Sequence, residues 1–253
     1  MAETKSFQSF RGECAWLNVG MQVSDCALTE VNKKLVRQCR ADRTISVADV
    51  LGVDVLTYPN LNHQAGSYKS VIGQTRNKHT EFAINYLYVL WTNYFKSILQ
   101  EIIDKNSSNI RMLSGINPSI NVGGIPLGDL VGLNDTITLR KTIVKHTLDY
   151  FTTFESTRFL MLRIIQYTGI RIAPAIINDA FYYMDIRNLF VHNKHRVSKD
   201  FYDKYHTTHP GIRIGMELIR SYQLYQKSFN AIYDLCEAVD KALLSAHFVT
   251  RTH

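Results

Sequence analysis

The sequence predicts an all-α protein, an up-and-down helical bundle preceded by an irregular N-terminal extension. Two observations support this fold class. After residue 80, long stretches repeat apolar residues every three or four positions, the pattern of helices that bury one face. Segments rich in Gly, Pro, Asn and Ser separate these stretches, as expected of loops between helices.

Residues 1–78 are expected to form an N-terminal extension or small subdomain, and residues 79–253 the helical domain. The N-terminal segment contains short mixed runs punctuated by Gly52, Pro59 and Gly66, and sustains no long helical period. It contains no unbroken apolar stretch typical of a signal peptide or membrane anchor.

The first helix of the helical domain is expected to begin at Thr80. Its apolar stripe consists of Ile84, Leu87, Trp91, Phe95, Ile98 and Ile102. Residues 106–136 are too rich in Gly, Asn, Ser and Pro for continuous helix and predict a long loop. A second helical region, which an internal break could divide, is expected over 138–167 and ends near Gly169.

Two further helices complete the predicted bundle. Pro174 suits the first turn of a helix, because its missing amide proton would be unbonded there in any case. After the Pro210-Gly211 break, apolar residues from Leu218 to Leu243 recur at the helical period and predict a last long helix.

The composition favours a protein of the cytoplasm with a polyanionic partner and without a membrane span. The 253 residues include 29 Lys and Arg against 22 Asp and Glu, a net charge of +7. The apolar-rich stretch at 82–91 is shorter than the roughly 20 residues that a bilayer span needs. The four cysteines show no Cys-x-x-Cys pairing, which argues against a zinc ribbon and favours reduced thiols.

The candidate site lies in residues 179–201, where the helix that begins at Pro174 presents polar residues instead of aliphatic ones. Arg187, Asn188 and His192 form its centre. The basic residues that follow are interleaved with aromatic ones, as an RNA-binding surface requires, and four of these residues are predicted to contact RNA: Lys194, His195, Arg196 and Lys199.

The phrase Arg187-Asn-Leu-Phe-Val-His192 resembles the signature of the HEPN superfamily of ribonucleases and toxins, in which Arg precedes His by a short spacing on a late helix of an all-helical domain. The resemblance covers roughly residues 80–247 by helix order. It implies a HEPN-type bundle and a metal-independent endoribonuclease without cofactor, acting as a toxin or antiviral defence effector. Arg140 and His146 also fit the spacing, but Lys141 follows that Arg instead of the polar residue that the family prefers.

These side chains can supply what RNA cleavage without a metal needs. His192 can exchange protons near neutral pH, and Arg187 offers a planar, permanently charged fork to phosphate oxygens. Asn188 shares a helix face with His192 and can orient the imidazole or hold a phosphate oxygen. Attack by the 2′-OH would leave a 2′,3′-cyclic phosphate.

Arg187 and His192 are five positions apart, which separates them by roughly 140° around a straight helix. The long arginine side chain, a bend, or a second subunit could bring them together. The resemblance implies the second subunit, because HEPN ribonucleases commonly place two motif copies in a cleft between paired domains. We therefore expect RNA and a second copy of the chain as partners, with a regulatory or antitoxin protein as a further one.

Other interpretations remain open from the sequence. Arg187 can pair with Asp185, and Asn188 can bridge helices, in a noncatalytic RNA-binding or protein-interaction module. The pairs His192/His195 and His206/His209 suggest zinc, although no cysteine completes a site. Glu81 faces the site or complements the dipole of a helix beginning nearby.

Overall fold

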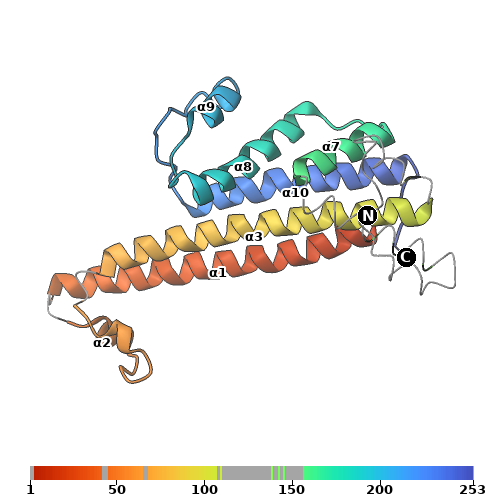
Figure 1. Ribbon diagram of the computed structural model, residues 1–253. Helices are drawn as coiled ribbons and strands as arrows, with labels where there is room; N and C mark the ends of the chain where they lie inside the picture. Colours follow the sequence, from red (N-terminus) through yellow and green to blue (C-terminus); the bar gives the residue numbers. More distant parts are fainter. Residues whose placement is uncertain are drawn as a thin grey trace. The chain divides into compact units, whose positions relative to one another are not determined.

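The protein is represented by a computed structural model that describes residues 3–41, 45–64, 68–106 and 156–252, with Asn109, Thr138, Thr142 and Lys145. Within these residues every extended regular element is a helix, which confirms the all-α class (Figure 1). The elements are α1 (Lys5–Ala41), α2 (Val47–Leu51), the 3-10 turn η1 (Pro59–Leu61), α3 (Tyr68–Lys105), α7 (Thr157–Thr168), α8 (Pro174–His192), α9 (Lys199–Tyr205) and α10 (Tyr222–Ser245).

Helix α1 is the largest departure from the sequence prediction. The expected irregular segment is wrong for residues 5–41, which form one helix of 37 residues. Its inward positions recur every seven residues, a spacing that keeps one seam of a helix facing a partner. These positions are Phe7, Cys14, Met21, Leu28 and Leu35, of which Leu28 is partly buried and the others buried.

The other helices lie where the sequence predicts them, but their lengths differ from the prediction. Helix α3 begins at Tyr68, well before the predicted start at Thr80, so the predicted domain boundary at 78/79 falls inside it. Helix α8 begins at Pro174 as predicted, and α10 confirms the last long helix. Of the predicted second helix, α7 confirms the C-terminal end, where Gly169 has a φ of 66°. The predicted loop at 106–136 lies outside the described residues, apart from Asn106 and Asn109.

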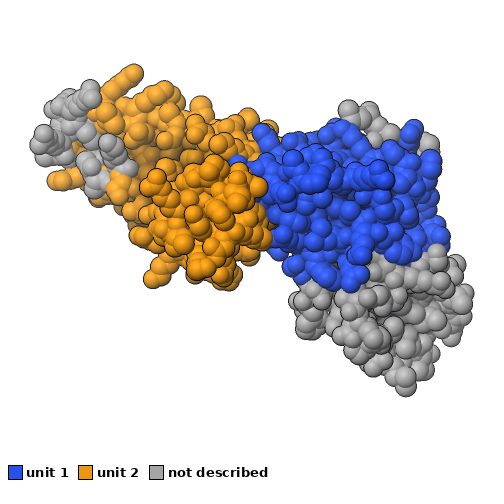
Figure 2. Space-filling view, turned by 90° about the horizontal axis from the view of Figure 1, so that it is seen from above, with its two compact units in different colours: residues 1–13, 88–183, 230–253 blue, residues 14–87, 184–229 orange. Residues whose placement is uncertain are grey.

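The chain forms two compact units, each composed of separate stretches of sequence and coloured separately in Figure 2. Unit 1 contains Met1–Glu13, Tyr88–Tyr183 and Asn230–His253, and unit 2 contains Cys14–Leu87 and Met184–Phe229. No helix of the described residues is both long enough and apolar enough to cross a membrane.

Unit 1 has an aromatic core. The ring of Phe7 lies 6.1 Å from that of Tyr94 and 5.7 Å from that of Tyr233. The Tyr94 hydroxyl donates to the Cys236 carbonyl oxygen at 3.1 Å, which links α3 to α10. The first turn of α1 is held by carboxylates of these two helices, because Thr4 donates its backbone N–H to Asp240 at 3.2 Å and Ser6 donates its own to Glu101 at 2.7 Å.

Unit 2 contains the whole candidate site and has two features that shape it. Leu35, Val47, Val50 and Ile72 form a buried cluster that packs α2 against α1 and α3. Residues 193–221 leave the end of α8, form α9, and return to the start of α10. This excursion is closed at its base, where the Val197 amide donates to the Met216 carbonyl and the Leu218 amide to the His195 carbonyl, both at 2.9 Å.

Candidate functional site

Arg187 is half-buried on α8 and is held by two amide side chains. Its Nε donates to Asn85 Oδ1 of α3 at 3.2 Å, and its Nη1 donates to Asn188 Oδ1 at 3.2 Å. The neighbouring carboxylate, Asp185, accepts a hydrogen bond from the Tyr205 hydroxyl at 2.5 Å and also pairs with Lys204. These two acceptors fix the orientation of the guanidinium, whose planar fork can bind phosphate oxygens.

His192 is the last residue of α8 and its side chain is exposed. Helix α8 is uninterrupted from Pro174 to His192, so no break in the helix reorients His192 toward Arg187. Within the described residues, the imidazole forms no hydrogen bond or ion pair. His192 is therefore free to meet a ligand or a second molecule, and the angular separation from Arg187 persists within one copy.

The backbone after α8 turns sharply and aims the next histidine inward. Lys194 and His195 both have left-handed backbone angles, with φ values of 48° and 68°. The amides of Asn193 and His195 both donate to the Leu189 carbonyl, at 3.0 and 3.1 Å, and close the helix end. Non-glycine residues adopt this conformation at a cost of about 1–2 kcal/mol each, so surrounding contacts must hold the turn in place.

This strain leads to a stability prediction. Lys194→Gly should raise the free energy of unfolding by about 0.5 kcal/mol, because glycine adopts a positive φ without the steric penalty and loses somewhat more entropy on folding. Urea denaturation measures the change. Lys227→Gly, at an exposed position within α10, is the matched control and should lower stability by about 1 kcal/mol. Equal losses in the two variants would contradict the prediction.

The turn places His195 against Glu81, at the centre of a charged cluster that also includes Arg220. The His195 Nε2 contacts Glu81 Oε1, and Arg220 Nη1 donates to the same oxygen at 2.7 Å. The three side chains are only 13% to 19% exposed. Lys78 pairs with the other carboxylate oxygen at 2.9 Å. Glu81 thus joins α3 to the turn after α8 and to the segment before α10.

The charges of this cluster define the protonation of His195. Partial burial alone would raise the pKa of Glu81, but hydrogen bonds from Arg220 and Lys78 outweigh it and lower that pKa. Partial burial, and then the Arg220 charge, lower the pKa of His195, and they outweigh the opposing effect of the Glu81 carboxylate. An ionised carboxylate can only accept, so the Nε2 of the neutral ring carries the proton and Nδ1 keeps its lone pair. His195 is a neutral imidazole oriented by a carboxylate.

Asn85 and Glu81 of α3 bind two residues at and just after the end of α8, Arg187 and His195. Asn85 and Glu81 lie four positions apart on α3, and therefore on one face of that helix. Asn85 accepts a hydrogen bond from Arg187, and Glu81 contacts His195, so one polar face of α3 positions both residues. Glu81 lies three turns into α3, which rules out the alternative in which it complements the dipole at a nearby helix start.

The other three predicted RNA contacts remain on the surface. Lys194, Arg196 and Lys199 are exposed. Arg196 donates to the Gly215 carbonyl at 3.3 Å, and Lys199 pairs with Asp203 at 2.5 Å. His195 is the exception, since its ring faces Glu81 inside the unit.

From the sequence we proposed the α8 residues but not Asn85, which contacts Arg187, or Arg220, which contacts Glu81. Both come from distant segments of the chain. Arg140 and His146, the second match to the motif spacing, lie outside the described residues. Among the described residues, no three His, Cys, Asp or Glu side chains are grouped as a metal ion would require.

Comparison of the chain with known proteins identified no relative. No protein-family model matches the chain, and neither the curated proteins nor the solved structures include a match to it.

Proposed function

We propose that this protein is a metal-independent endoribonuclease of the HEPN type, which cleaves RNA by attack of the 2′-OH and leaves a 2′,3′-cyclic phosphate. One observation carries the proposal. At the end of α8 an oriented, half-buried Arg187 stands on the same helix as an exposed His192, in the order of the HEPN signature. The helical fold in which the motif occurs is also the fold class that the resemblance implies.

Each residue receives a role from its position. Arg187, oriented by Asn85, stabilises the negative charge that grows on the phosphate oxygens in the transition state. Asn188 is exposed beside it and positions the phosphate. His192 takes the 2′-OH proton or protonates the departing 5′ oxygen. Lys194, Arg196 and Lys199 attract the RNA backbone from the surface.

His195 is the second imidazole in this region and supports a positioning role. Its Nε2 contacts Glu81, so the ring cannot move away from α3 without breaking the cluster of Glu81, His195 and Arg220. The contact holds the turn that follows α8 and thereby the exposed residues on either side of it. We assign proton transfer to His192 and the placement of the turn to His195.

A homodimer completes the proposed site. Exposed apolar side chains lie next to it in sequence on both helices: Phe82 is 66% exposed, Tyr86 36% and Val191 49%. Phe82 and Tyr86 stack with their ring centroids 6.1 Å apart. Burying such side chains is a driving force for association. A partner copy placed over them brings its own motif to this Arg187, which resolves the angular separation along α8.

The proposed setting is the cytoplasm, where a nuclease of this type acts as a toxin or antiviral defence effector. An enzyme that cleaves cellular RNA must be restrained between uses, so we include a regulatory or antitoxin protein among its partners. The net charge of +7 favours RNA as the ligand of the dimer.

The test is cleavage of RNA in excess chelator, with matched DNA as the control substrate. Wild-type protein should cut RNA into products with 2′,3′-cyclic phosphate ends and leave DNA intact, because DNA lacks the 2′-OH. Arg187→Ala and His192→Ala should each lower the rate by about 10²–10⁴-fold. Arg213→Ala removes an exposed arginine outside the proposed site and should leave the rate unchanged.

The second candidate function is a noncatalytic RNA-binding or protein-interaction module. The hydrogen bonds of Arg187 to Asn85 and Asn188 favour it, since they can also serve a purely structural role. RNA that is retained but never cut, by wild type and by the His192 variant alike, would establish this module and exclude the enzyme.

A further inference from the structure

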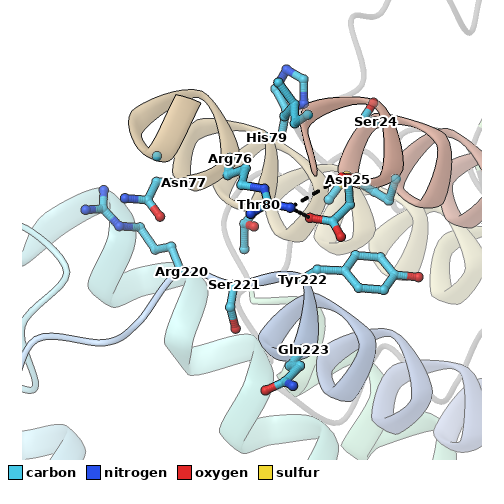
Figure 3. Close-up of a pocket in the computed structure, with 13 residues that line it drawn as sticks. Ser24, Asp25, Arg76, Asn77, His79, Thr80, Arg220, Ser221, Tyr222 and Gln223 are labelled. Carbon is cyan, nitrogen blue, oxygen red and sulfur yellow. Dashed lines mark hydrogen bonds and ion pairs between the residues drawn. The ribbon is translucent and has the colours of Figure 1, made fainter. Parts of the chain in front are cut away.

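Unit 2 contains a pocket of about 520 Å³ that the proposed cleavage site does not use (Figure 3). Its walls are α1, the N-terminal half of α3, and the segment that leads into α10. The volume is typical of sites for small organic ligands and far exceeds that needed by a simple ion.

The lining is basic and polar at one side and carries an aromatic ring. Two arginines, Arg76 and Arg220, and one histidine, His79, stand against a single carboxylate, Asp25. Asn77, Ser221 and Gln223 add amide and hydroxyl groups, and Tyr222 contributes its ring. Cationic groups, base-edge hydrogen-bonding groups and an aromatic face are the features that recognise a nucleotide.

Arg76 is the cation best placed for an anionic group. Its Nη2 pairs with Asp25 Oδ1 at 3.2 Å (Figure 3). The same nitrogen also contacts the Thr29 hydroxyl. Its Nε is buried and has no hydrogen-bond partner in the described structure. The Arg76 side chain is 35% exposed, whereas that of Arg220 is 17% exposed and is held by Glu81, so the guanidinium of Arg76 is the more accessible of the two to a ligand oxygen.

The start of α10 supplies a second set of donors beside Arg76. Ser221 caps this helix, accepting from the Leu224 amide at 3.2 Å, and Tyr222 is its first residue. The first amides of a helix have no intrahelical acceptor, and the helix dipole favours negative charge there. Residues of this turn line the same pocket as Arg76.

We propose that this pocket binds a nucleoside monophosphate unit, with the phosphate at Arg76 and the first turn of α10 and the base against Tyr222. The unit is either a free mononucleotide or the terminal nucleotide of an RNA strand. This binding goes beyond the proposed cleavage and does not depend on it. Arg220 links the two sites, because it lines the pocket and holds Glu81, which in turn contacts His195.

The test is isothermal titration of the full chain with the four ribonucleoside monophosphates, with inorganic phosphate as the reference ligand. Arg76→Ala should weaken nucleotide binding about tenfold or more. Asp25→Asn should strengthen it by about threefold, because it removes the carboxylate that competes for Arg76. Both variants break the same ion pair, so their opposite effects on binding separate ligand recognition from a shared loss of stability.

Controls and a second arm complete the experiment. Arg171→Ala removes an exposed arginine outside the pocket and should leave the affinity unchanged. Competition by short RNAs carrying a terminal phosphate, and not by those without one, assigns the pocket to RNA ends. If neither kind of RNA competes with the mononucleotide, the pocket is assigned to free nucleotides. The proposal is overturned if no mononucleotide binds, if phosphate alone binds equally well, or if Arg76→Ala and Asp25→Asn shift the affinity in the same direction.

Discussion

Mixing the Arg187→Ala and His192→Ala variants is expected to restore RNA cleavage that neither variant performs alone. Helix α8 is continuous through both positions, so the two side chains diverge within one copy of the chain. If a productive site takes Arg187 from one copy and His192 from the other, a mixed dimer contains one intact site and one doubly altered site. Random mixing of symmetric dimers should then recover about a quarter of wild-type activity.

The measurement is the initial rate on RNA after the two purified variants have been mixed and allowed to exchange subunits. Each variant alone, at the same total concentration, provides the baseline. The double variant Arg187→Ala with His192→Ala, mixed with either single variant, provides no intact site and is the matched control. A mixture as inactive as its components would show that each copy must supply both residues, and would remove the dimer from the catalytic proposal.

The sequence predicted α8 and α10 because their signals are local. A proline at the first turn marks the start of α8, and apolar residues at the helical period predict α10, which begins at Tyr222. Helix α1 was missed because its seam repeats every seven residues and includes small or polar residues. Cys14 occupies an inward position there, and Gly12 and Gly20 interrupt the helix-forming residues.

Only the part of the candidate site that lies on one helix, α8, could be predicted from the sequence. Arg187, Asn188 and His192 share a short motif, so a single pattern finds all three. Asn85 stands 102 positions before Arg187, and Arg220 stands 139 positions after Glu81. Contacts over such separations depend on how helices pack, which no local pattern encodes. Glu81 and Asn85 lie four positions apart and therefore on one face of a helix, but many other polar residues of the same helix have this spacing too.

The same dependence on packing explains His195. Its sequence neighbours are basic, which predicts an RNA contact, but the left-handed turn at 194–195 directs the ring to Glu81. Such backbone angles are uncommon at non-glycine residues, and Lys194 gives no sequence signal for them.

Removing the charge of Asp240 is expected to change how stability depends on pH. Asp240 is 1% exposed and accepts from the Thr4 hydroxyl and amide. Burial raises the pKa of Asp240 to about 6 from 3.8, against the opposing effect of the Thr4 hydrogen bonds, and the carboxylates of Glu101 and Glu3 raise it further. The folded protein therefore holds this proton more tightly than the unfolded chain does.

The direction of the effect follows from linkage. A folded-state pKa above the unfolded one favours folding fully below about pH 4, and this contribution is lost as the pH rises through about 6. A difference of about two between these pKa values corresponds to about 3 kcal/mol. Asp240→Asn has no proton to lose. Most of this change falls between pH 4 and pH 7, where the free energy of unfolding of the variant, relative to wild type, should thus shift by about 2 kcal/mol in favour of the variant.

Urea denaturation at intervals from pH 4 to pH 7 measures this shift. Any constant penalty from placing the asparagine amide near the Thr4 donors displaces the two profiles without changing their difference in slope. Asp104→Asn removes an exposed carboxylate of α3 and should give a profile nearly parallel to wild type. A profile for Asp240→Asn that also runs parallel to wild type would mean that Asp240 has the same pKa in the folded and unfolded chain, and that the contact with Thr4 compensates its burial in full.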